Sequence, residues 1–255
     1  MDKHCLRNGM EVFHLNRAET DFLYDEVFVS GSYLSHGISL ASNDIVFDVG
    51  ANIGIASLFF HKRSGPLRIH AFEPDPNVFA VLEANMVLHD CNAKVYNIAL
   101  GKSAGRAQFT IYPNNTVMSG LFADAEDDSN TTTTFMVNSG IPANDARDII
   151  EVTGKFEHQR IDCEIRTVSE IIEEQGIERI DLLKVDVEKA EMDVLTGIRE
   201  GHWPLVRQAV VEVHDIQNRL RDVQGLLRAQ GFEVVTEQDP LFENTPLYTI
   251  FALRS

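Results

Sequence analysis

An acid, two glycines and a second acid are the residues of this chain whose types and spacing most clearly suggest chemistry. Asp48 lies at the end of an apolar run, Gly50 and Gly54 follow before a helical pattern, and Glu73 ends the next apolar run. Ligands of an open α/β sheet bind beyond the carboxyl ends of its strands. We therefore expect a nucleotide there: Gly50 allows a close backbone approach, and the Glu73 carboxylate accepts hydrogen bonds from two ribose hydroxyls.

The glycine pattern distinguishes between classes of nucleotide. A dinucleotide diphosphate is usually bound by G-x-G-x-x-G at a helix N-terminus. Here Asn52 replaces the middle glycine, in Gly50-Ala51-Asn52-Ile53-Gly54. This departure favours an adenosyl amino acid, S-adenosylmethionine, over NAD. Two-glycine turns also occur in α/β folds that bind no nucleotide, so Glu73 is the residue on which the prediction depends.

Composition sets the broad class of the protein. The chain has 255 residues, of which 44% are hydrophobic and 24% charged, as in an ordinary globular protein with a substantial core. It has no apolar run long enough for a membrane span and no apolar core of a signal peptide near its start. Cys5, Cys91 and Cys163 are scattered, without metal spacing or a disulfide framework. We expect a cytoplasmic protein without a membrane partner.

The charge balance argues against one class of partner. The formal net charge is −17, and no basic run is present. Nucleic-acid binding depends on clusters of lysine and arginine that neutralise phosphates. We expect no nucleic-acid partner.

Hydrophobic periodicity predicts alternating strands and helices. Residues 19–30 suggest an amphipathic helix. The predicted strands are 44–49, 67–74, 93–100, 105–112, 160–167, 179–187, 206–214, 232–238 and 247–254. The predicted helices are 53–62, one starting at Pro76, one opened by a capping box of Thr167 and Glu170, one ending at Gly201 and one from Asp215 to Gly231.

This alternation predicts a parallel sheet with right-handed crossovers. Only about eight residues separate the last two strands, too few for a parallel crossover, so the final strand should run antiparallel. A seven-strand, mostly parallel α/β sheet with an antiparallel last strand is the Rossmann-like architecture of class I methyltransferases. We expect a helical lead-in over residues 1–43 and the core over 44–255.

Residues 113–158 interrupt the alternation of predicted strands and helices. They hold an acidic patch, four consecutive threonines and little apolar periodicity. A long segment without clear elements is often a functional lid. We interpret it as a cap over the substrate side, the alternative being a plain surface insertion.

Several blocks of the chain resemble the FkbM-type methyltransferases. They are FDVGANIG (47–54), FEPDP (72–76), NIALG (97–101), LLKVDVEKAEMDVLTGI (182–198) and VVEVH (210–214). The stretch 16–38 is similar to the lead-in of members found in polyketide and peptide assembly lines, and 122–160 is least alike. The chain departs from the family at Lys189, where glycine is usual. That lysine places a charge beside Asp186 and Glu188, which would disfavour a tight helix start or a metal.

The resemblance implies methyl transfer from S-adenosylmethionine, usually to a hydroxyl oxygen, and suggests an acyl or peptidyl intermediate tethered to a carrier protein. A free small molecule such as a sugar, an NAD-dependent oxidoreductase and a non-catalytic cofactor-binding partner remain alternatives. The chain is compatible with a free-standing enzyme and with a part of a multidomain synthase.

Acids and a histidine at later strand ends are the candidate catalytic residues. A hydroxyl must lose its proton to become a good nucleophile, and imidazole titrates near neutral pH, so His214 is the candidate base. Asp186 and Glu188 should end the adjacent strand and orient His214 or bind the cofactor. Glu212 should share the strand face of His214. These donors would suit magnesium or manganese, but nothing in the spacing selects a metal, and we expect none.

The predicted cofactor site extends beyond the glycine turn. Tyr33 and His36 flank a glycine-serine connector that could close over the cofactor, and Asn97 and Ala99 lie where the adenine edge would be recognised. The full predicted set is Tyr33, His36, Asp48, Gly50, Ala51, Asn52, Glu73, Pro74, Asn97, Ala99 and Asp186.

Overall fold

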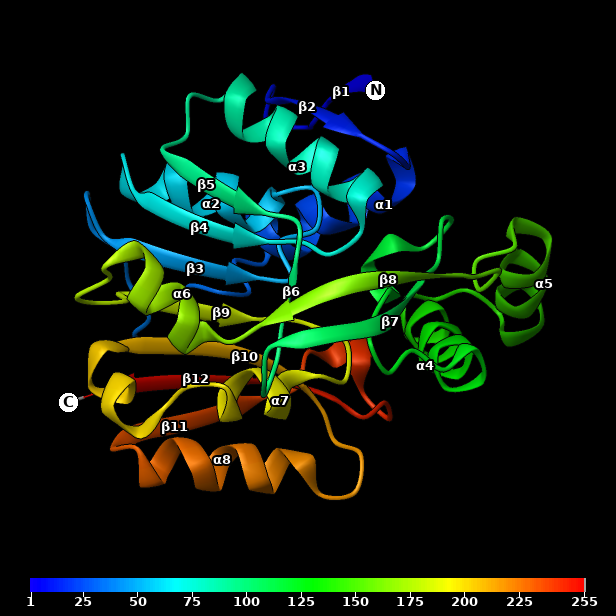
Figure 1. Cartoon of the computed structure of the whole chain (residues 1–255). Helices are drawn as coiled ribbons and strands as arrows, with labels where there is room; N and C mark the ends of the chain where they lie inside the picture. Colours follow the sequence, from blue (N-terminus) through cyan, green and yellow to red (C-terminus); the bar gives the residue numbers. More distant parts are fainter. Residues whose placement is uncertain (255) are drawn as a thin grey trace.

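A seven-stranded sheet forms the centre of the computed structural model, which describes residues 1–254 (Figure 1). Its strands are β3 (Ile45–Val49), β4 (Arg68–Phe72), β5 (Ala93–Tyr96), β9 (Leu182–Val185), β10 (Gln208–His214), β11 (Phe232–Glu237) and β12 (Leu247–Arg254). Their order is β11-β12-β10-β9-β3-β4-β5. β12 pairs antiparallel with both β10 and β11, whereas β10, β9, β3, β4 and β5 pair in parallel. The predicted sheet is confirmed, with the antiparallel strand lying one place in from the edge.

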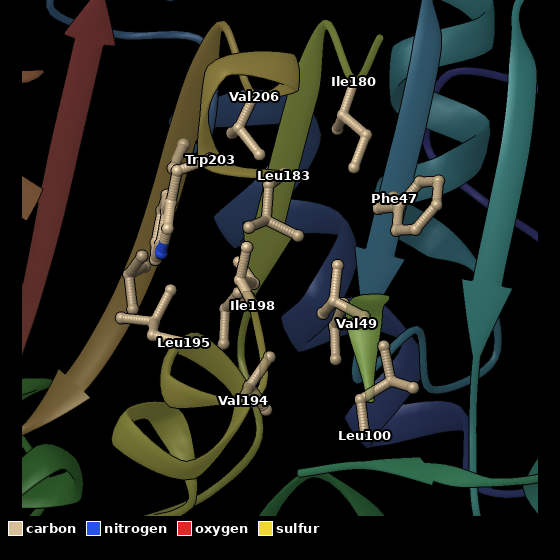
Figure 2. Close-up of a cluster of buried hydrophobic side chains, with 14 of the residues drawn as sticks. Phe47, Val49, Leu100, Ile180, Leu183, Val194, Leu195, Ile198, Trp203 and Val206 are labelled. Atoms are coloured by element: carbon tan, nitrogen blue, oxygen red, sulfur yellow. The ribbon is translucent and has the colours of Figure 1, made fainter. Parts of the chain in front are cut away.

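Helices cover both faces of this sheet. α2 (Ile55–Ser64) and α3 (Pro76–Leu88) lie on one face with α1 (Arg17–Tyr24), and α6 (Val168–Gln175), α7 (Glu191–Thr196) and α8 (Arg219–Ala229) lie on the other. Alternate residues of each strand point to opposite faces. Thus Phe47 and Leu183 belong to the core under α6 to α8, where Figure 2 shows them with Leu195, while Val46 and Leu182 belong to the core under α2 and α3.

A second, three-stranded sheet projects from the core. It consists of β6 (Ala99–Leu100), β8 (Gln159–Arg166) and β7 (Gly105–Ile111), in that order. The single strand predicted over 93–100 is therefore wrong, because the chain leaves the main sheet after Tyr96. Asn97 turns the chain there by donating its amide Nδ2 to the carbonyls of Glu73 and Pro74, at 2.9 and 3.0 Å.

The segment 113–158 is helical, contrary to the expectation that it lacks clear elements. A 3-10 turn, η2 (Thr116–Met118), precedes α4 (Ala125–Asn138) and α5 (Ala143–Thr153). Asp124 caps α4 by accepting hydrogen bonds from the N–H groups of Glu126 and Asp127. The two helices share a small core of Met136, Ala146 and Ile150, separate from the main one. Apolar periodicity was weak because so few residues of this pair are buried.

Other predicted boundaries shift at positions with a local cause. After α1 the chain continues as a π-helical turn, η1 (Asp25–Val29), in place of a regular helix to residue 30. α7 ends at Thr196 and not near Gly201; the Gly197 that follows packs so closely that a Cβ there would lie 2.2 Å from the carbonyl oxygen of Gly101. α8 begins after Asn218, which adopts a left-handed conformation, and not directly after Asp215.

Four short elements lie outside the predicted pattern. They are β1 (Asp2–Cys5), β2 (Glu11–His14), η3 (Glu200–Leu205) and η4 (Pro240–Phe242). Among residues 1–254, no helix combines the length and hydrophobicity needed to cross a membrane.

Candidate active site

The carboxyl ends of β3, β4, β9 and β10 open into one cavity of about 310 Å³. α1, η2, α4 and η4 supply the opposite walls. This is the edge at which α/β sheets bind ligands. In Figure 1, α4 lies beyond the arrowheads of the parallel strands, next to this edge.

The turn at Gly50 is the tightest part of the cavity wall. Gly50 has φ +77°, and a Cβ at this position would lie 1.7 Å from the carbonyl oxygen of Asp186, so only glycine fits. The N–H groups of Gly50 and Ala51 donate to the carbonyl of Phe72, at 3.1 and 3.0 Å. These bonds tie the turn to the end of β4 and leave its backbone facing the cavity.

Glu73 is bound to the same turn. Its Oε2 accepts a hydrogen bond from the Asn52 N–H at 3.1 Å, and its Oε1 accepts one from the Asp75 N–H at 2.9 Å. Burial raises the pKa of Glu73 to about 8. A buried carboxylate of this kind gains from further donors such as ribose hydroxyls.

Lys184 lies behind the Gly50 turn, and its role was not predicted. Its Nζ donates to the Gly50 carbonyl at 2.7 Å and lies 3.0 Å from Asp48 Oδ1 and 3.3 Å from Asp186 Oδ2. Burial alone lowers the pKa of the Lys184 ammonium, but Asp48 and Asp186 outweigh burial and raise it. The ammonium therefore fixes three groups of the site at once. The signal in the sequence was a single lysine in an otherwise apolar strand.

His214 is buried between two carboxylates. Its Nδ1 lies 2.8 Å from Glu191 Oε1, and its Nε2 lies 3.1 Å from Glu188 Oε2. Arg219 Nη1 donates to Glu191 Oε2 at 3.1 Å. Burial alone lowers the pKa of His214, but the two glutamates outweigh it and hold this pKa well above its ordinary value. The order Arg219, Glu191, His214, Glu188 is thus a chain of alternating charges that ends at the cavity.

Further acids gather around this end of the cavity. Carboxylate oxygens of Asp186, Glu188 and Glu212 lie within 4.8 Å of one another. Glu26 also lines the cavity, and burial, with Asp186 adding to it, raises the pKa of Glu26 to about 8. These acids suit a positively charged group, whether the amino-acid end of a nucleoside cofactor or a divalent cation, because a nearby cation favours their charged forms.

Lys189 connects this acidic loop to α4. It has φ +70°, a conformation that favours glycine. Its Nζ lies 2.6 Å from Asp128 Oδ1 of α4, and both side chains are buried. Asp128 also accepts a hydrogen bond from the Tyr112 hydroxyl at 2.9 Å. The expectation that this lysine adds its charge beside Asp186 and Glu188 is therefore wrong, because the charge is directed toward α4.

Replacing Lys189 with glycine is expected to destabilise the protein. Relief of the left-handed backbone returns about 1 kcal/mol, whereas a buried carboxylate without its counter-ion costs about 3 to 5 kcal/mol. We expect urea unfolding to give a lower free energy of unfolding, and hydrogen exchange to increase in α4. The double variant K189G/D128N removes both charges and should recover most of the loss. A single K189G variant as stable as the wild type would contradict the role of this ion pair.

The structure brings most of the predicted site residues together. Those that line the cavity are Tyr33, Gly50, Ala51, Asn52, Glu73, Pro74, Ala99, Asp186, Glu188 and His214. Tyr33 is almost fully buried and donates its hydroxyl to Asp186 Oδ2 at 2.8 Å. Asp48 lies one layer behind the cavity, where it pairs with Lys184 and accepts a hydrogen bond from Ser57. Asn97 forms the turn after β5.

His36 lies outside the cavity lining. Its Nε2 lies 2.6 Å from Glu237 Oε2, and its ring contacts the ring of Phe251 with a centroid separation of 4.7 Å. The connector that holds it packs against β11 and β12, since Gly37 lies against Leu253. The prediction that His36 binds the cofactor is therefore withdrawn.

A network from the lead-in helix also reaches the Gly50 turn. Asn52 Nδ2 donates to Thr116 Oγ1 at 3.0 Å, and the Thr116 N–H donates to Glu19 Oε2 at 3.0 Å. Next to Thr116, Asn115 lines the cavity with a buried Nδ2 that has no hydrogen-bond partner among residues 1–254. Such an amide is available to a ligand. No periodic pattern marks η2, so these residues were not predicted.

These features fit a nucleoside cofactor. The Gly50 turn lines the cavity, Glu73 offers carboxylate oxygens, and Asn115 offers an unused donor. Asp186 and its neighbours favour a cationic amino-acid end. The residues present therefore match S-adenosylmethionine, which combines a ribose with a sulfonium and an ammonium.

The strand order, the antiparallel β12 and the cradle at β3 and β4 together define a class I methyltransferase. The family described as "Methyltransferase FkbM domain" matches residues 48–234. The chain belongs to this family of S-adenosylmethionine-dependent methyltransferases. Family membership removes two alternatives raised by the sequence, the NAD-dependent oxidoreductase and the non-catalytic partner.

Three relatives illustrate the range of the family. The chain is 43% identical to 31-O-demethyl-FK506 methyltransferase FkbM of Streptomyces tacrolimicus, over 98% of this chain and 96% of that protein. It is 37% identical to AMB antimetabolite synthetase AmbE of Pseudomonas aeruginosa, over 98% of this chain but 12% of the synthetase. It is 27% identical to 2-O-methyltransferase NoeI of Sinorhizobium fredii, over 80% of each.

A solved structure supports the fold. Fibrillarin from Aeropyrum pernix, in complex with natively bound S-adenosyl-L-methionine, superposes with a TM-score of 0.50. The match covers 97% of this chain and 80% of fibrillarin at 13% sequence identity. At this identity the likeness establishes the architecture and not the substrate.

Proposed function

We propose that this chain is a cytoplasmic O-methyltransferase that methylates a hydroxyl group of a polyketide or peptide intermediate held on a carrier protein. The observation that carries the proposal is that one cavity joins the Gly50–Glu73 cradle to the His214–Glu188 pair. S-adenosylmethionine supplies the methyl group and a sulfur leaving group. The chain itself has to bind and align the cofactor and the acceptor, exclude water, and remove the proton of the acceptor hydroxyl.

The cradle residues have distinct binding roles. Glu73 accepts the ribose hydroxyls, and the backbone at Gly50, Ala51 and Asn52 faces the amino-acid arm. Asp186, held by Lys184 and Tyr33, attracts the ammonium of that arm. Pro74 and Ala99 line the wall on the adenine side.

His214 and Glu188 act on the acceptor. A neutral aliphatic hydroxyl is a weak nucleophile, so its proton has to leave as the new O–C bond forms and the S–C bond breaks. Glu191 holds Nδ1 of His214 and so directs Nε2 toward Glu188 and the cavity. In the neutral form of His214, the proton passes from the hydroxyl oxygen to Nε2, and the imidazolium that results is stabilised by Glu188 and Glu191. No metal is assigned a role in this step.

The names of the relatives support oxygen as the acceptor atom. One is named as a methyltransferase of 31-O-demethyl-FK506, another as a 2-O-methyltransferase, and a third is a synthetase that contains a similar segment. A free small molecule, including a sugar, is a second candidate acceptor, because neither of the two methyltransferases is named for a carrier-bound substrate.

The test is a transfer assay with labelled S-adenosylmethionine. Candidate β-hydroxyacyl substrates are offered on a carrier protein, as N-acetylcysteamine thioesters and as free alcohols. We expect a product heavier by one CH₂ unit with the label on oxygen, formed faster from the carrier-bound substrate. Equal rates for free and carrier-bound substrate would refute the carrier requirement, and label on carbon or nitrogen would refute O-methylation.

Replacing Glu73 with alanine is expected to weaken binding of S-adenosylhomocysteine by about 100-fold, because two charge-assisted hydrogen bonds of about 1.5 kcal/mol each are lost. Isothermal titration calorimetry gives the affinity. Glu83, an exposed acid on α3, provides the matched control E83A, for which we expect wild-type affinity. Unchanged affinity in E73A would show that the ribose is bound elsewhere.

A further inference from the structure

Part of the cavity wall is aromatic. Three phenylalanines from three separate elements line it: Phe22 of α1, Phe135 of α4 and Phe242 of η4. We call these residues the aromatic wall.

The rings of the aromatic wall are in mutual contact. Phe22 and Phe135 pack edge to face with centroids 5.3 Å apart, and Phe135 and Phe242 stack with centroids 5.1 Å apart. All three side chains remain half-buried despite these contacts. Apolar surface left uncovered inside a cavity is a site where an apolar ligand gains free energy by displacing water.

Contacts of α4 with two neighbouring segments hold part of the aromatic wall in place. Asn138, at the end of α4, donates its amide Nδ2 to the carbonyls of Leu241 and Glu243, both at 2.9 Å. These bonds tie α4 to the η4 segment that carries Phe242. The Lys189–Asp128 ion pair fixes the other end of α4. The positions of Phe135 and Phe242 are thus fixed by contacts that lie outside the wall itself.

Charge at the cavity disfavours an anionic acceptor. Six acids line it: Glu19, Glu26, Glu73, Asp186, Glu188 and Glu212. Of the two lysines in the lining, Lys184 is already paired with Asp48 and Asp186, which leaves Lys155. Burial raises the pKa of Glu26 and Glu73 to about 8, so the lining is not uniformly charged at neutral pH. A carboxylate or phosphate near the aromatic wall would still lose its hydration beside acidic groups and few cations.

We propose that the aromatic wall is the acceptor subsite and that it selects an uncharged, apolar carbon skeleton next to the hydroxyl that is methylated. This inference rests on the proposed function and specifies its substrate class. The apolar skeleton packs on Phe22, Phe135 and Phe242, which places its hydroxyl toward His214 and Glu188. Sugars and phosphorylated acceptors are selected against.

The experiment measures binding and not turnover. Saturation-transfer NMR gives the affinities of n-octanol, n-butanol and octanoate for the protein saturated with S-adenosylhomocysteine. We expect n-octanol to bind at least about tenfold more tightly than either of the other two, because longer apolar chains bury more surface and the carboxylate is repelled. In F135A the preference for n-octanol over n-butanol should fall to about threefold or less.

The matched control is F122A, since Phe122 lies just before α4 but is 52% exposed and outside the cavity lining. F122A should keep the wild-type preference. F242A repeats the test if F135A does not fold, as judged by S-adenosylhomocysteine binding. Equal affinity for the three probes, or a preference that survives in both F135A and F242A, overturns the subsite. Neither result affects the transfer assay, so failure of the subsite and failure of the methyltransferase proposal are distinguishable.

Discussion

Replacing Lys184 with methionine is expected to abolish cofactor binding and to lower the free energy of unfolding by about 3 to 5 kcal/mol. Methionine has a similar length and fills the same space, so the change removes mainly the charge. Asp48 is fully buried, and without the ammonium it would keep an uncompensated charge beside one remaining hydrogen bond from Ser57. The Gly50 carbonyl would lose its donor at the same time.

Urea unfolding measures the first effect, and calorimetry with S-adenosylhomocysteine measures the second. Lys94 on β5 gives a matched control, because it is an exposed lysine in the same sheet. K94M should stay within about 0.5 kcal/mol of the wild type. The double variant K184M/D48N should recover much of the stability, since no charge is left unpaired, but not the affinity. A fully stable K184M that still binds the cofactor would disprove the organising role of this lysine.

Replacing His214 with alanine is expected to reduce kcat by about 100- to 10,000-fold, which is the usual contribution of a general base. The affinity for S-adenosylhomocysteine should change little, because the Gly50–Glu73 cradle is on other strands. His158, an exposed histidine just before β8, gives the control H158A. If H214A retained most of the turnover with a verified acceptor, a different group would have to remove the proton.

The pH dependence of kcat/KM follows from the contacts of His214 with Glu188 and Glu191. Burial alone lowers the pKa of His214, but Glu188 and Glu191 raise it well above the ordinary value. His214 is then mostly protonated at neutral pH, and only its neutral form accepts a proton. We expect kcat/KM to rise with pH through this raised pKa. A flat profile in the alkaline range would exclude His214 as the base.

The free energy of unfolding should change with pH in the opposite direction to kcat/KM. A pKa that is raised in the folded state stabilises the protein fully below the unfolded pKa of about 6.5, and the gain is lost as the pH rises through the folded-state pKa. The free energy of unfolding of the wild type should therefore decline over the range in which kcat/KM rises. H214A should lack this component of the decline.

The parts of the site carried by regular strands could be predicted from the sequence. Gly50 and Glu73 follow directly after apolar runs, and parallel pairing brings such positions to one edge. His214 also follows an apolar run, and its strand β10 lies two places from β3 in the sheet; that order came from the family resemblance and not from periodicity. The apolar pattern of a strand shows where the strand ends, so the positions of residues at strand ends can be predicted from the sequence.

Residues whose roles depend on contacts across the fold could not be predicted. In the sequence, Lys184 is a single charged residue in an apolar strand. Its role becomes clear only from its ion pairs with Asp48 and Asp186 in the folded protein. Glu191 is in a short helix, and only packing against β10 brings it to His214. The prediction that His36 binds the cofactor also failed on a contact across the fold. The connector that carries His36 packs against β11, where His36 contacts Glu237, and no pattern in the sequence indicates that contact.

The proposed placement of adenosine across the ends of β3 and β4 is tested most directly by a crystal structure of the protein with bound S-adenosylhomocysteine. We expect both ribose hydroxyls on the carboxylate of Glu73, the amino-acid arm along Gly50, and the sulfur directed toward His214 and Glu188. A nucleoside bound away from Glu73, or a sulfur directed away from His214, would contradict it.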